Sequence, residues 1–136
     1  MGEIIYETDL TALYFHRREG IIHHEIRGFV NGPPFRDLLE RGAELMAEHG
    51  ARKWLSDDRG HEVLSPADEE WAKTVWFPRV KAAGWTHWAI VRPAKSVGRI
   101  NMERFAREYS AMGITARLFV EPSEALAWLS KPDPER

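Results

Sequence analysis

The sequence has 136 residues, which corresponds to about one domain and is enough to bury a hydrophobic core. Its composition, 43% hydrophobic and 29% charged, excludes wholesale disorder. A net charge of −2 with both signs spread along the chain argues against nucleic-acid binding, and the absence of cysteine excludes disulfides and thiolate chemistry.

The N-terminal residues show no signal peptide, because no basic region precedes an apolar one. No apolar run approaches the length that spans a membrane. We therefore expect a soluble, cytoplasmic protein without an integral membrane segment. Residues 1–130 are predicted to form a single domain, and residues 131–136 a solvated tail.

The first part of the chain is rich in β-forming residues, in three segments separated by turn signals. These predicted strands span residues 3–8, 12–17 and 21–30. In the third segment, alternation places Ile22 and His24 on one face and His23 on the other. Adjacent His23 and His24 are therefore expected to be satisfied or surface histidines rather than a metal-binding pair.

After residue 31, predicted helices and strands alternate, which indicates parallel strands joined by right-handed helical crossovers. Helices are expected at residues 35–50, 65–84, 100–113 and 121–129, and strands at residues 52–56, 88–91 and 115–120. Residues 93–98 are expected to be a loop. The predicted fold class is α/β, with N-terminal antiparallel strands followed by βα repeats in one mixed sheet and about four helices.

The segment from residue 65 to residue 92 has the clearest local signals. Ser65 is a good N-cap, Pro66 suits the first helical position, and Gly84 can end the helix in a left-handed conformation. Pro78 cannot donate a hydrogen bond to the carbonyl four residues earlier, so a kink is expected near Thr74.

The chain resembles the SpoIIAA-like family of small bacterial domains, which is similar to STAS domains and to CRAL-TRIO lipid carriers. The resemblance covers nearly the whole chain and implies a mixed sheet with no cofactor and no established catalysis. It also implies either a partner protein, with regulation by phosphorylation, or an apolar ligand held between helices and sheet. The matching segments are the N-terminal strands ending in Gly28, the strand ending in Asp57-Asp58, the block Trp76–Gly84 with the apolar strand after it, the Arg92-Pro93 loop and the segment Leu118–Leu129.

The phosphorylation motif of STAS domains is not matched here. That motif is Asp-x-Ser at a strand-to-helix turn, and no serine follows an aspartate at this spacing in the turn Ser56–Gly60. Ser65 is the remaining candidate. Its alternative role is a plain helix cap, since Asp68 to Glu70 already crowd that helix end with negative charge.

The six tryptophans are the strongest functional signal. They could simply pack the core, because each indole buries a large area. Alternatively, some of them form the face of a homodimer or line an apolar ligand pocket with Asp57 and Asp58 at its opening. The expected pocket residues are Trp54, Asp57, Asp58, Trp71, Trp76, Phe77 and Trp88.

Two polar clusters are weaker candidates. Asp57, Asp58, His61 and Glu62 follow a predicted strand, where they could hold a metal or act as acid and base, or simply form a polar connection. Around the glycine before the third helix, an anion site or a solvated loop could form. Its candidate residues are Lys95, Ser96 and Arg99.

The sequence thus favours a non-enzymatic domain that binds an apolar small molecule or a partner protein, without a cofactor or metal. The first alternative is a homodimeric protein-interaction domain without a ligand. The second is a small enzyme that uses the cluster from Asp57 to Glu62.

Overall fold

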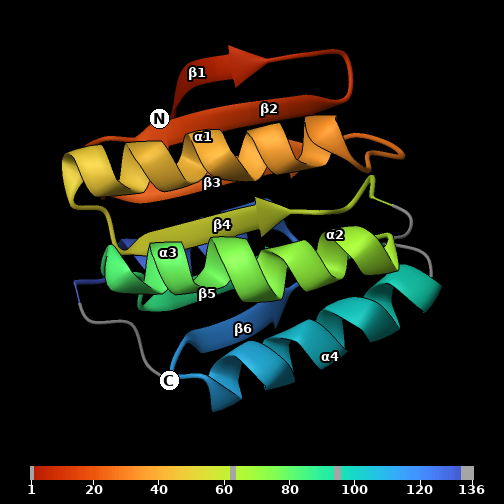
Figure 1. Ribbon diagram of the computed structural model, residues 1–136. Helices are drawn as coiled ribbons and strands as arrows, with labels where there is room; N and C mark the ends of the chain where they lie inside the picture. Colours follow the sequence, from red (N-terminus) through yellow and green to blue (C-terminus); the bar gives the residue numbers. More distant parts are fainter. Residues whose placement is uncertain (1, 62–63, 94–95, 133–136) are drawn as a thin grey trace.

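The computed structural model describes residues 2–61, 64–93 and 96–132. Within them the fold is α/β, with antiparallel strands followed by βα units, as predicted (Figure 1). None of the described helices combines the length and apolarity needed to cross a membrane. The elements are β1 Glu3–Glu7, β2 Thr11–His16, β3 Ile21–Ile26, α1 Pro33–His49, β4 Lys53–Asp57, α2 Pro66–Trp71, a π-helical turn Ala72–Trp76, α3 Phe77–Ala82, β5 His87–Val91, α4 Ser96–Ala111, β6 Thr115–Phe119 and α5 Pro122–Ser130.

The strands form one six-stranded sheet in the order β1-β2-β3-β4-β5-β6. The pairs β1–β2 and β2–β3 are antiparallel, and the remaining pairs are parallel. Each helical crossover advances by one strand in the same direction, so helices of one handedness must lie on one face. Figure 1 shows α1, the α2–α3 helix and α4 together on that face. The last helix, α5, packs against β4, β5 and β6 from the other side.

The two faces of the sheet carry different side chains, as strand alternation requires. We call the side under α1, α2–α3 and α4 the tryptophan face, because it buries Trp54 and Trp88. On the opposite side, the α5 face, the neighbouring strand positions are Leu55 and Ala89. The predicted alternation in β3 is confirmed, because Ile22 belongs to the tryptophan face and Ile21 to the α5 face.

Gly42 lies in the middle of α1, where glycine normally lowers helix stability. A Cβ atom at this position would overlap the Trp54 ring. The absence of a side chain therefore lets α1 lie directly on the indole, which closes the tryptophan face.

The helix from residue 66 to residue 82 is continuous but irregular. Its start is as predicted, since the Ser65 side chain accepts a hydrogen bond from the Asp68 amide at 3.2 Å. The expected irregularity before Pro78 is a π-helical turn, in which the Phe77 N–H bonds to the Ala72 carbonyl five residues earlier. Gly84 follows the helix with a φ of 111°, so the chain turns back toward β5.

Two predicted boundaries were wrong. The strand expected at residues 21–30 ends at Ile26, and the loop expected at residues 93–98 overlaps α4, which begins at Ser96. Gly98 lowers helix propensity but does not break a helix, so α4 continues through it.

Candidate functional site

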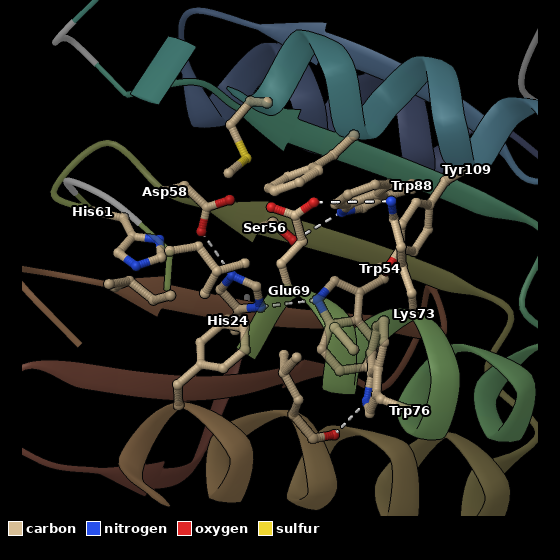
Figure 2. A pocket seen from close by; sticks show the side chains of 17 residues that line it. His24, Trp54, Ser56, Asp58, His61, Glu69, Lys73, Trp76, Trp88 and Tyr109 are labelled. Carbon is tan, nitrogen blue, oxygen red and sulfur yellow. Dashed lines mark hydrogen bonds and ion pairs between the residues drawn. The ribbon is translucent and has the colours of Figure 1, made fainter. Parts of the chain in front are cut away.

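A cavity of about 60 Å³ lies on the tryptophan face, between the sheet and the three helices that cover it (Figure 2). A buried water needs roughly 10–15 Å³ of such space, so the cavity has room for about four waters or for one molecule of similar size. Most of its wall is apolar. Besides the indoles, the lining side chains that carry polar atoms are His24, Ser56, Asp58, His61, Glu69, Lys73 and Tyr109.

The cavity is bounded by large aromatic rings that meet edge to face. The ring centroids of Trp54 and Trp76 are 5.1 Å apart with an interplanar angle of 86°. Trp76 in turn meets Trp85 at 5.3 Å and 66°. All three indoles are buried in the core, and Trp54 and Trp76 also line the cavity, whereas Trp85 lies behind them. The cavity lies beside the rings of Trp54 and Trp76.

The indole N–H groups at the cavity are already satisfied within the protein. Trp76 donates to the Leu39 carbonyl at 2.9 Å, and Trp88 donates to the Ser56 hydroxyl oxygen at 2.8 Å. These bonds fix the orientation of the rings. The indoles thus form a rigid apolar wall and offer no free donor to a ligand.

The third indole, Trp54, starts a buried hydrogen-bond chain that sets the protonation of His24. Trp54 Nε1–H donates to His24 Nδ1 at 3.0 Å, so Nδ1 carries no proton. The proton therefore resides on Nε2, which donates to Asp58 Oδ1 at 2.9 Å. A protonated imidazolium would direct an N–H at the indole N–H. The geometry thus holds His24 neutral, with both nitrogens engaged.

Ser56 lies directly beside His24 in the β3–β4 register and shares its face with Asp58, which superficially resembles a nucleophilic triad. A triad needs the histidine to accept the hydroxyl proton. His24 cannot do this, because Trp54 and Asp58 occupy its two nitrogens. The arrangement is a closed structural network rather than a nucleophile with its base.

His61 brings a buried nitrogen without a hydrogen-bond partner among the described residues to the cavity. Its side chain is buried, and Nε2 makes no hydrogen bond to any described residue. The His61 backbone N–H bonds to the Asp58 carbonyl at 3.0 Å, and the ring stacks on Phe35. A Cβ atom at Gly60 would lie 2.8 Å from the Arg27 backbone, so the loop presses closely on the end of β3. This close approach positions His61 over the cavity.

The two neighbouring aspartates that the sequence grouped together point to opposite faces. Asp57 ends β4 and binds Arg59 through both oxygens at 2.9 Å, away from the cavity. Asp58 lines the cavity. Glu62 lies outside the described residues. Among the residues that are described, no three His, Asp or Glu side chains are placed to hold a metal ion.

A charged cluster links α2 to α4 beside the cavity. Arg104 binds both oxygens of Glu69, at 2.7 and 3.0 Å, and Lys73 lies 2.7 Å from Glu108. The hydrogen bond from Arg104 lowers the pKa of Glu69. Burial raises the pKa of Tyr109, which lines the cavity on α4. The cluster contains two carboxylates and two cations, so it is neutral as a unit.

The structure thus brings together only part of the set that the sequence suggested. Trp54, Trp76, Trp88 and Asp58 line the cavity. Phe77 instead packs against Tyr109 at 5.0 Å, and Trp71 lies on α2 beneath the Arg36 guanidinium. These two rings are outside the lining because they project from the helix beside the cavity, not over it.

The remaining predicted site residues have a structural role, are exposed, or lie outside the described residues. Ser65 serves as the helix cap, and its backbone N–H bonds to the Asn31 side chain at 2.7 Å. Lys95 and the side chain of Ser96 are outside the described residues. Arg99 is exposed on the first turns of α4.

Sequence reasoning missed His24 as a site residue. The signal was its position between Ile22 and Ile26, which puts an imidazole on an apolar face. A second pair of histidines lies on the other face of the sheet. His16 Nε2 lies 2.9 Å from His23 Nδ1, but on the opposite side of the sheet from the cavity.

Comparisons of the chain with protein families, with curated proteins and with solved structures find no match. The resemblance to the SpoIIAA-like family therefore stays a prediction, and the functional argument rests on the cavity.

Proposed function

We propose that this chain is a non-enzymatic binding domain that holds a small, mostly apolar molecule in the cavity of the tryptophan face. The observation that carries the proposal is the buried His61 Nε2, which has no hydrogen-bond partner among the described residues. Leaving such a group unsatisfied costs about 1–3 kcal/mol, and a bound molecule with one polar atom would remove that cost. The apolar wall favours a hydrocarbon body for the rest of the molecule.

The volume limits the size of the ligand. Pockets for drug-sized molecules measure roughly 300–1,000 Å³, well above the space seen here. A cavity of about 60 Å³ suits a molecule of about four to six heavy atoms. A larger ligand would require α4 to move away from the α2–α3 helix, against the ion pairs between them.

The closed hydrogen-bond network of Trp54, His24 and Asp58 supports a binding role rather than a catalytic one. His24 has no free nitrogen for proton transfer, and Asp57 is turned away from Asp58. The opposite orientations of Asp57 and Asp58 speak against the enzyme alternative.

Native mass spectrometry of the purified protein, followed by titration with isobutanol under tryptophan fluorescence, tests this proposal. Isobutanol has a branched apolar body and one hydroxyl. Ala72 lines the cavity, so Ala72→Leu should fill it and abolish isobutanol binding. Ala67→Leu, on the exposed side of the same helix, is the matched control and should leave binding intact. Equal binding by both variants, or no binding by the unmodified protein, would contradict the proposal.

A second candidate is a homodimer, which an exposed apolar patch favours. Leu10 is 46% and Phe29 is 63% exposed, and both line a shallow groove together with Pro33 and Pro34. Light scattering of the protein and of Phe29→Ser tests this candidate. A dimer that becomes a monomer on substitution would support it, and a monomer in both cases would reject it.

A further inference from the structure

We infer that the ligand of this cavity presents a hydrogen-bond donor, and no negative charge, to Asp58 and His61. The inference rests on the proposed function and narrows it to a chemical class: small amides, alcohols or amines, and not carboxylic acids. It follows from the hydrogen bonds and charges around one end of the cavity. Figure 2 shows Asp58 and His61 at that end, with Trp76 and Tyr109 at the other.

The first step concerns the unused acceptor on Asp58. The side chain is 6% exposed, and Oδ1 accepts the hydrogen bond from His24. No hydrogen bond to Oδ2 is found among the described residues. A carboxylate can accept about four hydrogen bonds, so Asp58 has spare acceptor capacity at the cavity. A ligand O–H or N–H group can use it, whereas a ligand carboxylate cannot.

The second step concerns charge. Trp54 holds His24 neutral, so the partner of Asp58 donates a hydrogen bond without cancelling its negative charge. Asp57 provides the contrast, because Arg59 neutralises it through two hydrogen bonds. The charges of Glu69, Lys73, Arg104 and Glu108 balance one another. Counted over the described residues, the cavity therefore keeps one uncompensated negative charge, and an anionic ligand would be repelled at short range in a poorly solvated site.

The third step concerns His61. A neutral imidazole nitrogen either donates or accepts, depending on the tautomer. A ligand group that carries a donor beside an acceptor, such as a primary amide, can therefore bond to Asp58 through N–H and to His61 Nε2 through its oxygen. Both polar groups are then satisfied by one small ligand.

An isosteric pair of probes tests the inference on the unmodified protein. Isobutyramide and isobutyrate have the same shape and the same number of heavy atoms, but only the amide is a neutral donor. Titrations at pH 7 would follow the indole N–H resonances of Trp54 and Trp88 by NMR. Isobutyramide should bind about tenfold or more tightly than isobutyrate, since like charges in contact are strongly unfavourable. Asp58→Asn should remove most of this preference, and Asp57→Asn, its neighbour on the other face, should preserve it.

The outcomes separate the inference from the proposal it rests on. Any other order of affinities on the unmodified protein, including equal binding or binding of neither probe, overturns the inference. If isobutanol still binds in that case, the proposed function stands. If isobutanol fails as well, both fall. The result does not depend on the variants, because the two probes are compared on the unmodified protein first.

Discussion

The two faces of the sheet are filled by different side chains. The α5 face is filled mainly by Ile21, Leu55, Ala89 and Val91 under a single short helix. The tryptophan face is filled by indoles under three helices, and a cavity remains among them. The α5 face also buries one indole, Trp128, so the two faces differ in how many indoles they hold and in how many helices cover them. The cavity lies on the face that holds the larger group of indoles.

The adjacent Asp57 and Asp58 also differ between the two faces, in how their negative charges are compensated. On the α5 side, Asp57 is neutralised by a half-exposed arginine. On the tryptophan side, the side chain that binds Asp58 among the described residues is the neutral imidazole of His24. Two consecutive buried carboxylates thus differ in their partners, because Asp57 binds a half-exposed arginine on one face and Asp58 binds a histidine on the other.

The largest expected effect follows from truncating the tryptophan face. Trp54→Ala should lower the free energy of unfolding by about 3–5 kcal/mol, since it leaves a larger cavity and removes the donor to His24. Leu55→Ala probes the α5 face at the position next to Trp54, and it should lower the free energy of unfolding by about 2–5 kcal/mol. Urea unfolding monitored by circular dichroism measures both. A negligible effect of Trp54→Ala would mean that its ring is not a rigid wall.

A second prediction tests the contact between α1 and the indole. Gly42→Ala should destabilise the protein by about 1–3 kcal/mol, because the new methyl group overlaps the Trp54 ring. In an unobstructed helix the same change would stabilise by about 1 kcal/mol. Thermal unfolding gives the sign, and Glu44→Ala on the exposed side of α1 is the control. A stabilising Gly42→Ala would show that Trp54 does not lie against the helix.

The third prediction uses pH on the α5 side of the sheet. Burial, followed by the neighbouring His16, lowers the pKa of His23 from 6.5 to about 3. The unfolded chain thus binds a proton that the folded chain excludes, so stability falls as pH decreases from about 6.5 toward 3, by up to about 1.4 kcal/mol per pH unit. His23→Gln should reduce the number of protons taken up on unfolding by about one, which denaturant titrations between pH 7 and pH 4 measure as a shallower slope of stability against pH. An unchanged slope would place the proton uptake elsewhere.

Much of the difference between the two faces was predictable from the sequence, because it depends on the two-residue alternation of side chains along each strand. Alternation in β3 placed His23 and His24 on opposite sides, and the βα order predicted the sheet. The cap at Ser65 and the irregularity before Pro78 follow from local chemistry.

The site itself was less predictable, because it depends on contacts between distant residues. Trp54 and His24 are 30 positions apart, and no local signal indicates that the indole would fix the imidazole. His61 reaches the cavity only because Gly60 lets its loop press on the backbone of Arg27. Phe77 and Trp71 were grouped with the cavity by composition, although their positions on the helix direct them elsewhere.

The smallest expected effect concerns the ion pairs that join α2 to α4. Arg104→Gln should lower stability by at most about 1 kcal/mol, because the pairs are partly exposed. The same variant should speed isobutanol exchange, measured by NMR line shapes, since α4 is then held less firmly over the cavity. Arg79→Gln removes a comparable pair with Glu40 between α1 and α3, and it should not change the exchange rate. Equal exchange in the two variants would show that the ligand enters by another route.

The central claim is that His61 is the polar end of a ligand site. Histidine-selective ¹⁵N NMR during an isobutanol titration tests it most directly. The account predicts that the His61 Nε2 resonance shifts and saturates with the added alcohol, while His16 and His23 on the other face stay unchanged. If the His61 resonance stays fixed throughout the titration, the claim is contradicted.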